Sequence, residues 1–238
     1  MSKSLIPRYI KGFLKFYAFG VFVFSMLRAI LFLINAGSSA QESVSTILQA
    51  FIIGFRFDTV VLAYLFLLPF TLASLNALVV RNWLSRFLTK FLIALLVPLA
   101  FIISIGDIPY YGHFSQRLSV AAFNWTESPD FVLGMVLQEP RYAAFLLVIV
   151  AVVFIYSLFY KRNIHWLTLS ERPKRIPHYV IFIIMAGLIV LGGRGRLEQK
   201  SPIRVGTAFF SNNPFLNNLG LNANYSLMHS IDDNQQAS

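Results

Sequence analysis

The sequence predicts an all-α membrane protein with five transmembrane helices and short interfacial helices on the outer face. Its composition excludes a water-facing globule, because 57% of its 238 residues are hydrophobic and only 13% are charged. Five long apolar stretches then recur along the chain, at residues 13–34, 55–80, 87–105, 142–160 and 178–193. At about 1.5 Å per residue, each reaches across or nearly across a hydrocarbon layer about 30 Å thick. Only helices satisfy their backbone hydrogen bonds within such runs, since barrel strands are far shorter.

The first apolar stretch resembles a secretory signal at both of its ends. Four basic residues lie before it or in its first turn, and the small residues 36–40 after it suit a cleavage site; the basic residues are Lys3, Arg8, Lys11 and Lys15. A cleavable signal has an apolar run of roughly 7 to 15 residues, whereas this run has about 22. We therefore interpret it as a retained signal anchor.

The second stretch is too long for a simple crossing if its helix begins near Ser45. From Ser45 to Val80 one helix would measure well over 40 Å. Either the helix projects outward, or its first turns lie on the membrane surface. Arg56 and Asp58 fall in this part, so they lie in the headgroup layer or a few turns beneath it.

The connection between the third and fourth stretches, residues 107–141, is expected to carry a short interfacial helix. Ser128-Pro129-Asp130 is a typical helix start, and apolar residues follow at helical spacing: Phe131, Val132, Met135 and Val136. Such a helix would lie in the outer interface. The alternative is a loop that begins the fourth crossing early.

The distribution of charge predicts the orientation. With the amino terminus in the cytoplasm, the basic residues on that side outnumber a single acid, Glu171; they are Lys3, Arg8, Lys11, Lys15, Arg81, Arg86, Lys90, Lys161, Arg162, Arg172, Lys174 and Arg175. The positive-inside rule then places the carboxyl terminus outside after five crossings of a bacterial plasma membrane. The net charge of +10 is better explained by anionic headgroups than by nucleic acid, which we do not expect as a partner.

The chain offers no catalytic residue and no metal or cofactor site by its motifs. It lacks cysteine, so thiolate chemistry and disulfides are excluded. Its histidines, His113, His165, His178 and His229, lie in separate loops without the spacing of metal ligands. Phosphate-binding glycine loops, nucleophile elbows and helical zinc motifs are missing as well.

Polar residues cluster in or near the outer leaflet instead. They are Arg28, Arg56, Asp58 and Asp107, with Tyr110, Tyr111 and Arg117 just beyond. Because a charge at the bilayer centre costs about 3 kcal/mol or more, such residues are usually paired or functional. They can form a pocket for a phospholipid headgroup, since guanidinium groups suit phosphate. Alternatively, Arg28 pairs with Asp58, and Arg56 and Arg117 extend to water; one arrangement can do both.

The sequence changes character after residue 193. Residues 1–193 are the predicted five-helix domain, and residues 194–238 are a predicted extracytoplasmic interfacial linker. Within the linker, Asn213-Pro214 can start a short helix with Phe215, Leu216 and Leu219 on one side. Such a segment lies on a surface and does not cross it.

Several of these segments together look like the membrane domain of lipoteichoic acid synthase-like proteins. The segments are Phe55-Arg56-Phe57-Asp58, Gly106-Asp107 with Tyr110-Tyr111 and Arg117, Arg194-Gly195-Arg196, Pro202-Ile203, Asn213-Pro214-Phe215-Leu216-Asn217 and Leu221-Asn222. This resemblance covers nearly the whole chain, and its tail pattern is the most specific part. The chain departs from the family at Arg196, where a second glycine is common, and at Ser201, where an arginine often precedes the proline.

The resemblance implies a phosphoglycerol or phosphoethanolamine transferase of the alkaline phosphatase and sulfatase superfamily. Such proteins have five amino-terminal helices, a linker and an external α/β catalytic domain with a threonine or serine nucleophile and a divalent metal. We expect that domain to be missing from this chain and to follow it as its partner, with membrane phospholipid as the other partner. Two other classes stay open: a non-enzymatic membrane scaffold or sensor, and a small transporter component, although the chain shows no internal repeat.

Overall fold

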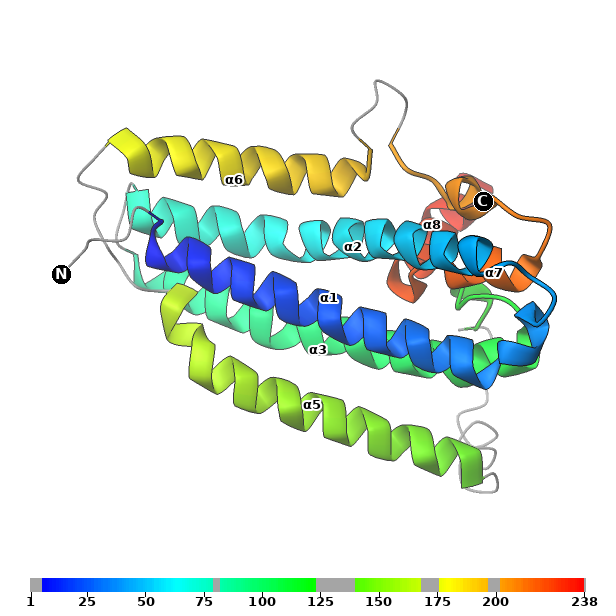
Figure 1. The fold of residues 1–238 in the computed structure, drawn as a ribbon. Helices are drawn as coiled ribbons and strands as arrows, with labels where there is room; N and C mark the ends of the chain where they lie inside the picture. The colour runs from blue at the N-terminus through cyan, green and yellow to red at the C-terminus, as the bar shows by residue number, and fades with distance from the viewer. Residues whose placement is uncertain (1–5, 79–81, 123–139, 168–175, 197–201, 238) are drawn as a thin grey trace. The chain divides into compact units, whose positions relative to one another are not determined.

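The computed structural model describes residues 6–78, 82–122, 140–167, 176–196 and 202–237, and all structural statements concern these residues. In chain order the elements are α1 (Arg8–Ile34), η1 (Ala36–Ser39), α2 (Val44–Leu78), α3 (Trp83–Phe114), α5 (Pro140–Leu167), α6 (Ile176–Arg194), η3 (Val205–Ala208), α7 (Pro214–Leu219) and α8 (Ala223–Ala237). They can be followed by colour in Figure 1. No strand occurs in these ranges, so the predicted all-α class is confirmed.

Four helices are long and apolar enough to cross a membrane: α1, α2, α3 and residues Ala144–Leu167 of α5. These are the helices of a multi-pass membrane protein, as predicted. The fifth predicted stretch forms α6, whose described apolar part, Tyr179–Arg194, is shorter. The predicted interfacial helix at residues 128–136 lies outside the described residues.

The second predicted stretch forms a single uninterrupted helix. α2 has 35 residues, which corresponds to about 52 Å. Its start is set by Ser43, whose hydroxyl oxygen accepts a hydrogen bond from the backbone nitrogen of Thr46 at 3.2 Å. The helix therefore begins well before the apolar stretch.

The chain folds into two compact units, to which α1, α2, α3 and α5 each contribute a part. The first unit comprises Met1–Phe22, Thr59–Leu99 and Ile155–Pro202. The second unit comprises Val23–Asp58, Ala100–Phe154 and Ile203–Ser238.

Aromatic side chains fill the first unit. The ring of Phe13 lies edge-on to Phe66 and Phe70, at centroid distances of 6.0 and 5.2 Å. Phe19 stacks on Phe159 at 4.3 Å. Edge-to-face and offset contacts of this kind each add about 0.5–1.5 kcal/mol to the burial of the rings. They hold α1 against α2 and α5 within this unit.

In the second unit the short helix α7 confirms the helix start predicted at Asn213-Pro214. The Asn213 side chain accepts hydrogen bonds from the backbone nitrogens of Phe215 and Leu216, at 2.9 and 3.4 Å, and Pro214 occupies the first turn. The predicted apolar side of α7 is buried, with Leu216 and Leu219 at 0% exposure.

After α7, 15 residues of the segment predicted as an interfacial linker form the helix α8. Asn222 starts this helix, since its side-chain oxygen accepts a hydrogen bond from the backbone nitrogen of Asn224 at 2.9 Å. Ala223 and Leu227 are buried. The first turns of α8 thus belong to the packed core of the second unit, whereas residues 231–235 are exposed.

Candidate functional site

Arg28 and Asp58 form a buried ion pair in the second unit. Arg28 of α1 is 5% exposed and Asp58 of α2 is 0% exposed, and the Arg28 Nη2 atom lies 2.6 Å from the Asp58 Oδ1 atom. Gly54 lies one turn before Asp58 on the same face of α2. A Cβ at Gly54 would overlap the Arg28 guanidinium. Because glycine has no side chain, the Arg28 guanidinium can lie directly against the backbone of α2 at this position.

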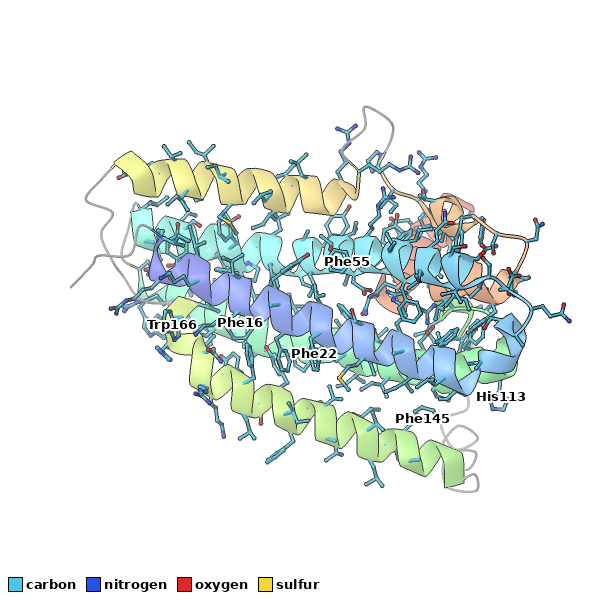
Figure 2. All side chains as sticks on the ribbon, in the orientation of Figure 1. Phe16, Phe22, Phe55, His113, Phe145 and Trp166 are labelled. Atoms are coloured by element: carbon cyan, nitrogen blue, oxygen red, sulfur yellow. The ribbon has the colours of Figure 1, made fainter. Side chains whose placement is uncertain are left out.

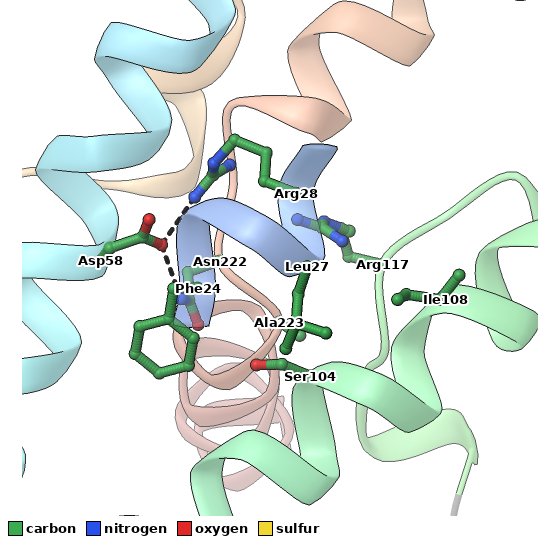
Figure 3. A pocket seen from close by; sticks show the side chains of 9 residues that line it. All are labelled: Phe24, Leu27, Arg28, Asp58, Ser104, Ile108, Arg117, Asn222 and Ala223. Carbon is green, nitrogen blue, oxygen red and sulfur yellow. Dashed lines mark hydrogen bonds and ion pairs between the residues drawn. The ribbon is translucent and has the colours of Figure 1, made fainter. Parts of the chain in front are cut away.

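Arg28 and Asp58 both bind the carboxyl-terminal part of the second unit, Ile203–Ser238, which we call the tail. The Arg28 Nη1 atom donates hydrogen bonds to the carbonyl oxygens of Leu219 and Leu221, the latter at 3.1 Å. The Asn222 side-chain amide donates to Asp58 Oδ1 at 2.8 Å. Figure 3 shows both partners of Asp58, with Arg28 and Asn222 reaching it from different elements. Residues of the tail thus complete an ion pair between two long helices.

A second buried pair, Asp107 and Arg117, lies at the end of α3. Asp107 is 0% exposed and accepts hydrogen bonds from the Arg117 guanidinium and from the backbone nitrogen of Leu118, the latter at 2.7 Å. The chain can return onto Asp107 because Ser115 adopts the left-handed conformation, with φ of 53°, directly after the helix ends. Asp107 thereby anchors the loop that follows its own helix.

The two pairs share one acceptor, the carbonyl oxygen of Leu221. Arg117 donates to it through Nη2, and Arg28 donates to it through Nη1. Burial lowers the pKa of the Arg117 guanidinium, while the Asp107 carboxylate opposes this effect. Arginine nevertheless keeps its charge near neutral pH. Two positive charges therefore stand against two carboxylates, Asp58 and Asp107, in one buried cluster.

A small cavity of about 20 Å³ opens inside this cluster. Its lining residues are Phe24, Leu27, Arg28, Asp58, Ser104, Ile108, Arg117, Asn222 and Ala223. Two polar atoms of the cluster, Asp58 Oδ2 and Arg117 Nε, are buried without a hydrogen-bond partner among the described residues. The volume suits about one water molecule.

The tail is fixed by further contacts beyond the arginines. The side-chain amide of Asn224 donates to the Ala100 carbonyl at 3.0 Å and to the Ser104 hydroxyl at 2.9 Å. Five apolar side chains of the tail are also buried: Phe215, Leu216, Leu219, Leu221 and Leu227. Full burial of one such side chain contributes about 1.5–3 kcal/mol. The tail is therefore a structural part of the second unit.

The structure brings together some of the predicted site residues and not others. Arg28, Asp58, Asp107 and Arg117 meet in the cluster, and the ion pair between Arg28 and Asp58 is the one considered in the sequence analysis. Tyr111 is buried, with its ring 5.8 Å from that of Phe215. Tyr110 is half-buried beside Phe114. Arg56 is exposed and is not among the residues that line the cavity.

Sequence reasoning missed the tail's share in the site. The Leu219 and Leu221 carbonyls are main-chain atoms, which no side-chain pattern reveals. Asn222 belongs to the tail pattern that carries the family resemblance, but nothing in its spacing points to Asp58. Gly54 offered a usable signal, because a glycine one turn from a buried aspartate marks a close approach.

The cluster fastens a chain segment. Its guanidinium groups are occupied by carboxylates and carbonyls, and no group of three His, Asp or Glu side chains that could hold a metal occurs in the described ranges. Comparisons with protein families, characterised proteins and solved structures find no match to the chain.

Proposed function

We propose that the chain is the membrane-anchoring domain of a bacterial lipid-headgroup transferase, of the phosphoglycerol or phosphoethanolamine kind. One observation carries the proposal: Arg28 and Arg117 both bind the main chain of the tail, so the segment that leaves the helices is fastened to them. An anchor needs such a fastening to hold a following domain at a defined place. The resemblance to lipoteichoic acid synthase-like proteins supplies the class of reaction.

In this proposal the catalytic domain follows the tail outside the membrane and brings the nucleophile and the divalent metal. A fastened tail confines that domain to the headgroup layer, where the lipid donor is concentrated. Because α7 and the first turn of α8 are buried in the second unit, the chain that leads to that domain would start from a fixed position. The membrane domain would then set both the height and the direction of the active site.

The proposal includes five crossings, with α6 as the fifth. Its apolar part, Tyr179–Arg194, would span at about 1.5 Å per residue most of a thin hydrocarbon layer. The basic flanks favour the amino terminus in the cytoplasm of a bacterial plasma membrane and residues 194–238 outside it. The short helix α7 would then lie on the outer face.

Contact with the donor headgroup is assigned to the part of the predicted site that is not enclosed. Arg56 is exposed on α2, in the turn that precedes Asp58, and Tyr110 is half-buried. The enclosed Arg28, Asp58, Tyr111, Asp107 and Arg117 would support this surface from below. A guanidinium at Arg56 suits a phosphate through paired donors.

The first test concerns the protein that the gene encodes. The gene is sequenced past codon 238. The full-length product is then assayed for headgroup transfer from phosphatidylglycerol and phosphatidylethanolamine. We expect a downstream domain with a threonine or serine nucleophile and metal ligands, and turnover of one of these lipids. A stop codon directly after Ser238 would reject the transferase and favour a scaffold or sensor.

The second test concerns Arg56 and uses Arg204 as its control, because both arginines are exposed in the second unit. In the full-length protein, Arg56→Gln should raise the KM for the donor lipid about tenfold, as expected for loss of a charged hydrogen bond to phosphate. Arg204→Gln should leave it unchanged. Equal kinetics for both variants would remove Arg56 from the donor site.

A further inference from the structure

Basic side chains are numerous among the described residues of the first unit. Its described residues include no aspartate or glutamate. Basic residues occur near the ends of three of its helices, namely Arg8, Lys11 and Lys15 on α1, Arg86 and Lys90 on α3, and Lys161 and Arg162 on α5. A surface of one sign attracts a ligand of the opposite sign.

Side-chain contacts show that these helix ends meet. The Lys15 ammonium donates a hydrogen bond to the Asn163 side-chain oxygen at 3.2 Å and lies 4.0 Å from the centre of the Trp166 ring. The Tyr160 hydroxyl donates to the Lys90 carbonyl at 3.1 Å. The turn of α5 that holds Lys161 and Arg162 is thus tied to α1 on one side and to α3 on the other. Figure 2 shows Trp166 of this turn beside α1.

An exposed aromatic row on α3 borders the charges. Trp83, Phe87 and Phe91 stack in sequence at centroid distances of 5.6 and 6.0 Å, and they are 70%, 49% and 49% exposed. Arg86 and Lys90 fall on the same side of the helix, because residues three and four apart are neighbours on a helix surface. Positive charge and a wide apolar surface therefore lie next to each other.

We propose that the ends of α1, α3 and α5 form a binding site for an anionic phospholipid. The basic residues would bind the phosphate, and the aromatic row would receive an acyl chain. Lysine and arginine near helix ends meet phosphate at the headgroup layer, where tryptophan and tyrosine also collect. Nucleic acid would use the charges but would leave the aromatic row of a membrane-crossing helix without a partner. This site is separate from the arginine cluster, whose charges are paired, and it does not depend on the proposed transferase function.

The test measures binding of phosphatidylglycerol and phosphatidylcholine to the purified full chain in detergent, by native mass spectrometry. Arg162→Gln is compared with Arg204→Gln, because each removes one exposed arginine, from the first and the second unit respectively. Arg162→Gln should weaken phosphatidylglycerol binding about fivefold, and Lys161→Gln combined with it by about a further fivefold. Arg204→Gln should change it less than twofold, and phosphatidylcholine binding should be equal in all variants.

Three outcomes would overturn the site. Equal weakening by Arg162→Gln and Arg204→Gln would show that net charge alone attracts the lipid. Inorganic phosphate that competes with phosphatidylglycerol at equal concentration would point to a soluble anion. A single-stranded oligonucleotide that binds more tightly than the lipid, and is weakened by Arg162→Gln, would assign the surface to nucleic acid.

Discussion

The two units of the chain use charge in opposite ways. In the second unit, Arg28 and Arg117 are buried against Asp58 and Asp107. In the first unit, basic side chains such as Lys161 and Arg162 are exposed, and the described residues include no acid. Buried charges must be paired because desolvation is costly, whereas exposed charges at a membrane are free to bind headgroups. Charge is therefore paired inside the fold in one unit and available to a ligand in the other.

The largest expected effect comes from breaking a buried pair. Asp58→Asn leaves the Arg28 guanidinium without its carboxylate in a buried place, so we expect the free energy of unfolding to fall by about 3–5 kcal/mol. Reversible unfolding in mixed micelles measures this change. The double change Arg28→Met with Asp58→Leu should recover part of the loss, because it removes both charges. If the double variant is as unstable as the sum of its single changes, the two charges are not coupled.

An intermediate effect is expected where Arg28 lies against α2. Gly54→Ala places a methyl group in the position of the guanidinium, and overpacking of this kind costs about 1–3 kcal/mol. Gly106→Ala on α3 is the matched control, since a Cβ there meets no atom within 4 Å. It should stabilise its helix by about 0.5–1 kcal/mol. Equal stability of the two variants, measured by thermal unfolding in the same detergent, would contradict the close approach of Arg28.

The smallest effect on stability is expected in the first unit. Lys15→Gln removes a hydrogen bond to Asn163 and a contact with the Trp166 ring, but Lys15 is exposed. The free energy of unfolding should therefore fall by less than about 1 kcal/mol. Measurement in detergent without anionic lipid isolates this contribution. A loss as large as that of Asp58→Asn would erase the contrast between the units.

The helices could be predicted from the sequence because the membrane imposes them. Any apolar run as long as residues 55–80 must satisfy its backbone internally, so hydropathy alone locates α2. Its true start at Val44 was harder to place, since Ser43 and Thr46 form a cap that a hydropathy window averages away. The fifth crossing and the orientation stay predictions, because they depend on a membrane as well as on the chain.

The site could be predicted only in part. Arg28, Asp58 and Asp107 were identifiable because a charge within an apolar helix requires a partner. Which partner each one has depends on the rotation of the helices, which the hydropathy pattern does not set. The contribution of the tail could not be predicted for another reason. α8 has a polar composition, and its helix is stabilised by the packing of Ala223 and Leu227 and by the cap at Asn222.

The shared acceptor at Leu221 has a consequence for how the tail can evolve. The guanidinium groups recognise peptide oxygens, so they do not distinguish one side chain from another at positions 219 and 221. Their hydrogen bonds depend instead on the spacing of the acceptors along the chain, because only Gly220 lies between Leu219 and Leu221. Point substitutions that keep the volume of these leucines should be tolerated, whereas inserting or deleting one residue between Leu219 and Leu221 would change the spacing of the two acceptors that Arg28 binds.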